Sequence, residues 1–289
     1  MIDLHLHTTF SDGASQAEDI ILQAIEYGLE AIAITDHDNT ESFAIAKALA
    51  ASKESPMEVI PGIEINTVWH SPTYGAQEVH VLGFYIDTQA PELRAVIEKH
   101  REARKNQIRQ MTNKLQEAKL NVSYEDILSL SHEQGSLGRP HVAKALVEKA
   151  GVPSISEAFS RYLTPKSATF IRRETVSPHE AVEAIYDSGG IPVIAHPSDM
   201  QGIEELVVEL IDYGLRGLEA YHKRHTPPVI EFYCTMAEKY DLIVTGGTDF
   251  HGVHESYNTA LSRLHIPDNV YAGLKAEHQR RKMAQFKVS

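Results

Sequence analysis

Two histidines lie one residue apart near the N-terminus, in the stretch Asp3-Leu4-His5-Leu6-His7. Residues two apart on a β-strand point to the same side, so both imidazoles would face one ligand. Asp249 and His251 repeat this spacing near the other end of the chain. Imidazole and carboxylate groups are the usual protein ligands of Zn, Mn and Fe, and the two pairs therefore indicate a metal site.

Further histidines and carboxylates stand at the ends of other apolar runs. They are Asp12, His37, Glu64, His80 and His196. Each of them alone is more simply explained as a structural or surface residue, but their joint placement is not. Together with the two pairs they make nine groups, which is too many for one ion. The set predicts two or three divalent ions, with Glu64 as a bridging carboxylate.

The elements that must position these groups are short strands alternating with helices. The expected strands are Ile2–Leu6, Ala31–Thr35, Glu58–Ile65, Val79–Tyr85, Ile191–Ala195, Gly217–Tyr221 and Leu242–Gly246, with a polar loop at His70–Gly75. Capping boxes that begin at Ser15 and Ser177 predict the starts of two helices. Such alternation favours a mainly parallel sheet, open or closed into a barrel. In a barrel, the carboxyl ends of the strands would bring the candidate ligands together.

The middle of the chain follows a different pattern. Helical stretches are expected at Lys99–Leu120, Tyr124–Leu130, Pro140–Lys149 and Ile155–Leu163, and strand patterns are missing there. We therefore expect a helical insertion at residues 98–165. It would divide a barrel whose two parts are residues 1–97 and 166–289.

Composition narrows the possible partners. The chain has 289 residues and a net charge of −13, which disfavours a broad electrostatic grip on duplex DNA. A phosphorylated substrate stays possible, because metal ions make their own site electropositive. Cys234 is the one cysteine, and neither a secretory signal nor a long apolar stretch is visible. These features predict a cytoplasmic protein without a membrane partner, and they leave the oligomeric state open.

Six motifs carry a family resemblance. The stretches DLHLHTTFSDG, AITDHDN, PGIEI, EVHVLGF, VIAHP and GGTDFH resemble the successive motifs of the PHP (polymerase and histidinol phosphatase) family. The resemblance implies a distorted (β/α)7 barrel, of class α/β, with an inserted helical lid. It also implies two or three divalent metal ions, with manganese expected first and iron or zinc as alternatives.

The resemblance assigns the nine groups to three ions. It places one ion on His5, His7, Glu64 and Asp249, a second on Glu64, His80 and His196, and a third on Asp12, His37 and His251. Many relatives, histidinol phosphatases among them, have a histidine where this chain has Asp12. The SDG stretch instead resembles the subgroup that acts on 3′,5′-nucleotide bisphosphates and RNA 5′ ends.

The insertion also resembles that subgroup. LGRPHVAKALVEKAGV and AFSRYLTPKSATFI are similar to its lid, which implies that Arg139 and His141 bind the substrate phosphate. Arginine suits this role because its planar fork binds phosphate through two hydrogen bonds. The resemblance also places His225 toward the nucleotide. Lys166 in the lid, and Tyr221 and His222 as stacking partners of a base, complete the candidate substrate set.

The resemblance implies a metal-dependent phosphoesterase. Its expected reactions are removal of the 3′-phosphate of pAp to give AMP and 5′-to-3′ trimming of short 5′-phosphorylated RNA. A metal-bridging hydroxide held by Glu64 would attack, while Arg139 and His141 stabilise the phosphate. Three alternatives stay open: a phosphatase for another small phosphomonoester such as histidinol phosphate, a non-catalytic PHP accessory module, and an amidohydrolase.

Overall fold

The chain forms two compact units. The computed structural model describes residues 1–130, 137–171, 175–252, 261 and 264–286. One unit joins Met1–Val96 to Val176–Ser289, and the other consists of Ile97–Thr175. The second unit extends beyond residue 165, where the sequence pattern placed its end. Hydrogen bonds explain the difference, since Thr169 donates to the Tyr162 carbonyl at 2.6 Å and Gln107 donates to the Ile171 carbonyl at 2.7 Å.

The first unit is built on one seven-stranded sheet whose order follows the sequence. Its strands are β1 Ile2–Leu6, β2 Ala31–Ile34, β3 Glu58–Ser71, β4 Gly75–Phe84, β5 Ile191–Ile194, β6 Gly217–His222 and β7 Ile243–Gly247. β4 runs antiparallel to both β3 and β5, and the other neighbouring pairs are parallel. The prediction of a mainly parallel sheet is confirmed, with β4 reversed. The predicted loop at His70–Gly75 was too long, because β3 and β4 continue toward each other as a hairpin.

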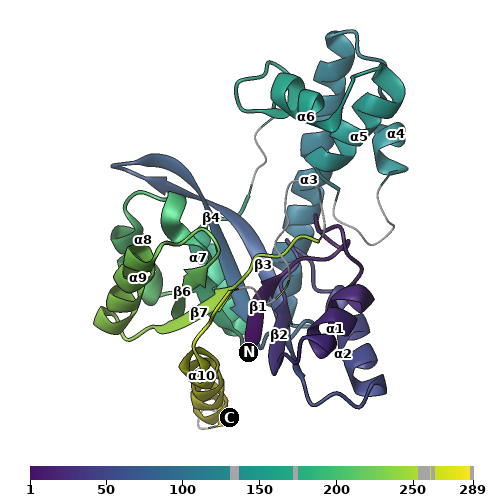
Figure 1. Ribbon diagram of the computed structural model, residues 1–289. Coiled ribbons are helices and arrows are strands. Elements are labelled where there is room, and N and C mark those ends of the chain that lie inside the picture. Colours follow the sequence, from purple (N-terminus) through teal and green to yellow (C-terminus); the bar gives the residue numbers. More distant parts are fainter. Residues whose placement is uncertain (131–136, 172–174, 253–260, 262–263, 287–289) are drawn as a thin grey trace. The chain divides into compact units, whose positions relative to one another are not determined.

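The first and last strands lie side by side, and the sheet is nearly closed into a barrel (Figure 1). The His7 amide donates to the Phe250 carbonyl at 2.9 Å, and the Phe250 amide donates to the His5 carbonyl at 3.3 Å. The buried Asp3 carboxylate also accepts from the amide and hydroxyl of Thr248, at 2.9 and 2.6 Å. Asp3, which precedes the histidine pair, therefore joins the two ends of the sheet.

Two apolar clusters pack on opposite sides of β1. Ile2 and Leu4 join a cluster with Leu82 and Val193, whereas Leu6 joins a second cluster with side chains of the first two helices. The β1–β2 register shifts between Asp3 and Leu6, and this irregularity explains how Leu4 and Leu6 can face opposite ways.

Helices follow most strands of the barrel unit. They are α1 Ala17–Glu26, α2 Ser42–Ser52, α7 Pro178–Asp187, the 3₁₀ turn η2 Pro197–Asp199, α8 Ile203–Ile211, α9 Pro227–Lys239 and α10 Asp268–Phe286. The capping box at Ser177 is confirmed, since Ser177 and Glu180 exchange hydrogen bonds. The one at Ser15 was wrong. Gln16 precedes α1 without a side-chain cap, and the Ser15 carbonyl instead accepts from the Thr9 amide at 3.0 Å.

The second unit is helical. Its elements are α3 Pro91–Glu117, which begins in the barrel unit, α4 Tyr124–Leu128, α5 Arg139–Ala150, α6 Ile155–Ala158 and the π-helical turn η1 Phe159–Leu163. Apolar side chains of these elements form a core of their own, including Ile108, Met111, Ile127, Leu146 and Leu163. None of the helices in the described parts of the chain has both the length and the apolar character needed to cross a membrane.

Candidate metal centre

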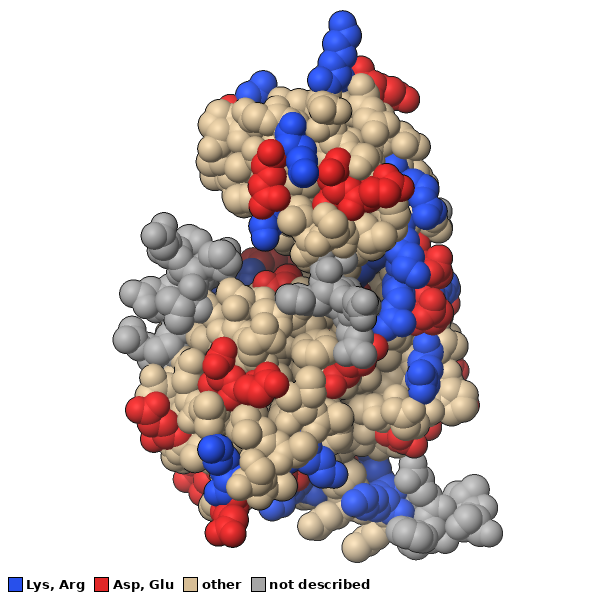
Figure 2. All heavy atoms as spheres, turned by 90° about the vertical axis from the view of Figure 1, so that its right-hand side faces the viewer, with Lys and Arg blue, Asp and Glu red and all other residues tan. Residues whose placement is uncertain are grey.

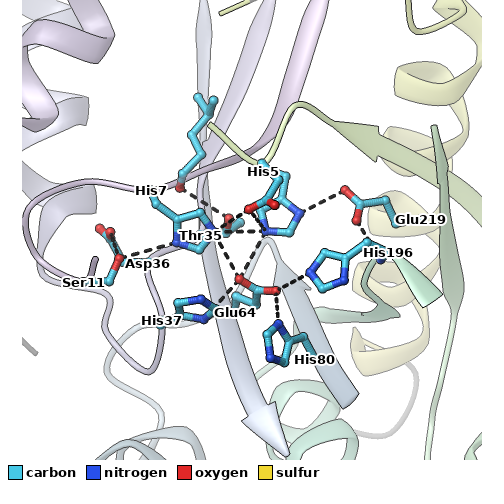
Figure 3. Close-up of polar contacts among 12 residues, drawn as sticks. His5, His7, Ser11, Thr35, Asp36, His37, Glu64, His80, His196 and Glu219 are labelled. Atoms are coloured by element: carbon cyan, nitrogen blue, oxygen red, sulfur yellow. Dashed lines mark hydrogen bonds and ion pairs between the residues drawn. The ribbon is translucent and has the colours of Figure 1, made fainter. Parts of the chain in front are cut away.

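Five imidazole rings contact one buried carboxylate, that of Glu64. The Oε2 atom of Glu64 lies 3.2 Å from His5 Nε2, 3.1 Å from His7 Nε2 and 3.1 Å from His37 Nδ1. Its Oε1 atom lies 2.9 Å from His80 Nδ1 and 3.1 Å from His196 Nε2. The rings come from β1 and β4 and from the segments that follow β1, β2 and β5, and they converge on this one group (Figure 3). Each oxygen of Glu64 thus faces a different set of histidines, as a bridging carboxylate between two ions requires.

The position of Glu64 differs from the expected strand end. β3 runs on to Ser71, so Glu64 lies inside a strand rather than after one. It lies level with the end of β2. The backbones of His37 and Glu64 form an isolated parallel β-bridge, and the Asp38 amide donates to the Glu64 carbonyl at 2.9 Å. The neighbouring parallel strand is shorter, and its end leaves the Glu64 side chain open to the site.

His80 reaches the site through the reversal of β4. It lies in the middle of β4 and just ahead of the residues Val81–Phe84 that pair with β5, which in a fully parallel barrel would place it at the end away from the other ligands. β4 is antiparallel to β5, and the His80 carbonyl accepts from the Ala195 amide at 2.9 Å. The antiparallel direction therefore brings His80 beside His196 at the carboxyl end of β5.

Asp249 completes the environment of the N-terminal histidines. Its Oδ1 atom lies 3.6 Å from His5 Nε2 and 3.4 Å from His7 Nε2. Asp249 and His196 both have positive backbone φ angles, of 51° and 24°. Such conformations are uncommon for residues other than glycine and cost of order 1–3 kcal/mol each. This strain lies at two of the candidate ligands, where it orients their side chains inward.

Asp12 lies in a second cluster beside the first. Its carboxylate lies 3.3 Å from His251 Nε2, 3.7 Å from His7 Nδ1 and 3.8 Å from His37 Nε2. In His7, Asp12, His37 and His251, one possible metal-ligand atom from each residue lies within 4.8 Å of the others. The same holds for His5, His7 and Glu64, and for His37, Glu64 and His80. The structure thus brings all nine expected ligands together. His7 and His37 each present one nitrogen to Glu64 and the other to Asp12, so the clusters share imidazoles.

The charges of the site are strongly coupled. Burial by itself lowers the pKa of His7 and His80, but nearby carboxylates, Glu64 above all for His80, outweigh it and raise each pKa to about 10. Burial dominates at His37 and lowers its pKa to about 3. Burial would raise the pKa of Glu64, yet the surrounding histidines hold it well below its usual value. Cations are therefore already favoured around an ionised Glu64.

Two carboxylates that the sequence reasoning missed support the ligands. Glu219 is fully buried on β6 and accepts from His5 Nδ1 at 3.0 Å and from the His196 amide at 2.8 Å. Asp36 accepts from the amide and hydroxyl of Thr8 and from the Ser11 hydroxyl, each at 2.7 Å. Glu219 orients two ligands, and Asp36 fixes the loop that leads to Asp12. The available signal for Glu219 was a carboxylate inside an apolar strand.

The β6 end carries three of the expected substrate residues. His222 is fully buried, with Nε2 3.5 Å from Asp249 Oδ2, and its ring is packed against His196 and His225. Tyr221 packs against the apolar cluster that contains Leu4 and Val193. The ring of His222 is tilted against His196 and edge-on to His225, and base stacking by His222 stays a prediction. His225 is nearly buried and donates from Nδ1 to the Ala220 carbonyl at 2.8 Å.

Lys223, in the same segment, was not anticipated. Its ammonium donates to the Asp249 carbonyl at 2.5 Å and lies 3.4 Å from Asp249 Oδ2. It thus contacts a candidate ligand from outside the imidazole cluster.

The remaining expected substrate residues belong to the helical unit. Arg139 is the exposed first residue of α5, with its guanidinium 6.0 Å from the Phe170 ring centre. His141 accepts from the Gly138 amide through Nδ1 at 3.2 Å and so caps the helix start. Lys166 is exposed in the segment after η1. Within their own unit, Arg139 and Lys166 are accessible to a ligand.

Comparison with known proteins identifies the family. The model of the PHP domain family matches residues 3–170, which is more than half of the chain. The chain belongs to the PHP domain family. A crystal structure from Bifidobacterium adolescentis, described as that of a metal-dependent phosphoesterase, is similar with a TM-score of 0.81 and 29% identity. The likeness covers 95% of both chains.

Curated relatives of similar length have three different activities. A 3′,5′-nucleoside bisphosphate phosphatase from Chromobacterium violaceum is 31% identical over 88% of each chain. The 5′-3′ exoribonuclease Rnm of Salmonella typhimurium is 29% identical over 86% of this PHP protein and 84% of its own chain. A phosphoribosyl 1,2-cyclic phosphate 1,2-diphosphodiesterase from Eggerthella lenta is 30% identical over 86% of this chain and 94% of its own. All three activities break phosphate ester bonds.

Proposed function

We propose that this PHP protein is a metal-dependent phosphoesterase for nucleotides. It removes the 3′-phosphate from nucleoside 3′,5′-bisphosphates such as pAp, and it trims short 5′-phosphorylated RNA in the 5′-to-3′ direction. Both reactions hydrolyse an ester bond to a ribose 3′ oxygen. In the RNA reaction, the phosphate of the next nucleotide takes the place of the terminal phosphate. The bacterial phosphatase and exoribonuclease among the relatives support this pairing.

The observation that carries the proposal is the arrangement around Glu64. Five imidazole nitrogens lie within 3.2 Å of its two carboxylate oxygens, and Asp12 and Asp249 add further oxygen donors. This donor set suits borderline divalent ions, and manganese is the proposed metal. Bound metal ions supply Lewis acidity and lower the pKa of a coordinated water.

The side chains of this protein supply the rest of the mechanism. The buried Glu64, His5 and His7 would hold the metal ions, and the side chains of Asp12 and His251 beside them are partly exposed. Arg139 binds substrate phosphate, because a guanidinium presents two parallel donors to phosphate oxygens. His141 adds a further donor once it releases the Gly138 amide. His225 faces the nucleotide, and its Nε2 has no hydrogen-bond partner among the described groups.

A substrate panel tests the proposal. Purified protein with Mn²⁺ should release phosphate from pAp and shorten 5′-phosphorylated RNA one nucleotide at a time. The panel also contains histidinol phosphate and phosphoribosyl 1,2-cyclic phosphate. Turnover of either of these, while pAp and RNA stay inert, would overturn the nucleotide assignment. Full function in cells of a His7→Ala variant would favour a binding module over an enzyme.

The role of Arg139 has a matched control in the same unit. Arg139→Ala should raise the KM for pAp, because the variant loses a charge-assisted contact to phosphate. Arg161 is also an exposed arginine of the helical unit, paired with Glu157 at 2.8 Å. Arg161→Ala should leave the KM unchanged. Equal effects of the two substitutions would remove Arg139 from the phosphate site.

A further inference from the structure

The net charge of −13 is the sum of a positively charged helical unit and a negatively charged barrel unit. Residues 97–175, the helical unit, hold 14 lysine and arginine residues against nine acidic ones, a net charge of +5. The rest of the chain holds 13 against 31, a net charge of −18. Separation of charge between parts of a chain is typical of proteins with a polyanionic partner. The acidic total therefore says little about the helical unit.

Part of this positive charge forms a regular row on α3. Arg101, Lys105 and Arg109 are spaced four residues apart, so they project from the same face on successive turns, about 6 Å apart along the axis. A neighbouring face of the helix, about a quarter turn away, carries the buried Ile108, Met111 and Leu115. We call Arg101, Lys105 and Arg109 the basic row. The space-filling view shows exposed lysine and arginine side chains with acidic ones close to them (Figure 2).

Two members of the basic row form ion pairs within their own helix. Arg101 lies 3.4 Å from Glu98 and Lys105 lies 2.6 Å from Glu102, in exposed pairs three residues apart. Exposed pairs of this kind contribute about 0–1 kcal/mol, so a phosphate can replace the carboxylate at little cost. Arg109 instead contacts the neutral Asn106 at 3.4 Å, and its guanidinium lies 4.9 Å from the centre of the Tyr124 ring.

We propose that the basic row binds the phosphate backbone of single-stranded RNA. The evenly spaced cations on one helix can follow one backbone, and the aromatic Tyr124 beside them offers a surface for an unpaired base. This inference rests on the proposed function, since it assumes that RNA is a substrate. It adds a surface outside the metal centre that holds the part of an RNA not undergoing cleavage.

The test is RNA binding as a function of salt. A short 5′-phosphorylated RNA is titrated with the full-length protein in EDTA, which prevents cleavage. The variant Arg101→Ala/Lys105→Ala/Arg109→Ala should lower the slope of log K against log salt by about 2, since each contact to a single strand contributes roughly 0.7. Alanine is a strong helix former, so α3 should persist, and circular dichroism checks this.

The matched control removes the same charge elsewhere in the unit. Lys144, Lys149 and Arg161 are exposed on α5 and η1, and the variant Lys144→Ala/Lys149→Ala/Arg161→Ala should keep the wild-type slope. Equal loss in both variants, or no loss in either, would overturn the inference, as would equally tight binding of duplex RNA. Turnover of pAp by the wild type reports separately on the proposed function, because pAp is too small to reach along a helix surface.

Discussion

His5 uses its two ring nitrogens for two different carboxylates. Nδ1 lies 3.0 Å from Glu219 and Nε2 lies 3.2 Å from Glu64, and all three residues are buried. A proton on Nδ1, donated to Glu219, leaves the Nε2 lone pair available for a metal ion. Burial disfavours a charged His5, yet Glu219 and Glu64 raise its pKa well above the ordinary value. Glu219 thus fixes the tautomer and the ring orientation of His5, which is itself a candidate metal ligand.

The substitution Glu219→Gln tests this relationship. Glutamine keeps the shape but weakens the acceptor, and loss of such outer partners typically costs 10–100-fold in metal affinity or activity. We expect a loss of this size in Mn²⁺ affinity, measured by titration of the metal-free protein. Glu205, exposed on α8, provides the control, and Glu205→Gln should bind metal normally. Unchanged affinity in Glu219→Gln would show that His5 is oriented by packing alone.

Metal uptake should release protons from the site. In the metal-free protein His7 and His80 have a pKa of about 10 and are protonated at neutral pH. Both must lose a proton to become ligands, so apparent affinity should rise with pH by up to about 100-fold per unit. Calorimetry at pH 8 in buffers of different ionisation enthalpy measures the protons released. A result of zero protons would show that neither histidine changes protonation on binding.

The metal-free protein should lose stability as the solution becomes alkaline. The pKa of His7 and His80 is raised on folding from 6.5 to about 10, so the folded state binds protons more tightly. Their contribution is complete below pH 6.5 and disappears as pH rises through 10. We expect the Tm of the metal-free protein to fall across this window, and the metal-loaded Tm to fall less. Equal pH profiles with and without metal would contradict this expectation.

Gly247 permits the closure of the barrel next to His5. A Cβ atom at position 247 would lie 2.3 Å from His5 Cβ and 2.5 Å from the His5 amide nitrogen. Gly247→Ala must push β1 and β7 apart, which should cost about 1–3 kcal/mol and weaken metal binding. Chemical denaturation and metal titration measure the two effects.

Gly273 offers the opposite outcome as a control. It lies within α10, and an added Cβ there meets no atom within 4 Å. Gly273→Ala should therefore raise the stability by about 0.5–1 kcal/mol, without a change in metal affinity. Similar destabilisation by both alanine substitutions would remove the special role of Gly247.

The local sequence was sufficient for most elements and for the identity of the candidate ligands. All seven strands occur near their expected positions, because each is a short apolar run between polar turns. His5 and His7 face the same group, as their spacing predicted, although the register of β1 shifts between Asp3 and Leu6. Helix starts were less certain. Ser15 has the right neighbours for a cap, but its carbonyl is used by the loop that carries Asp12.

Contacts between distant residues were decided only by the tertiary structure. Nothing local specified that β4 would run antiparallel and so deliver His80, since strand direction depends on pairing with β3 and β5. Nothing in the sequence near Glu219 indicated a role at the site, because its partner His5 lies 214 positions away along the chain. The net charge likewise acquired its meaning from the division into two units. Residue types and local periodicity thus determined which groups could bind metal, whereas the pairing of distant strands decided which of those groups face one another and which buried carboxylate orients them.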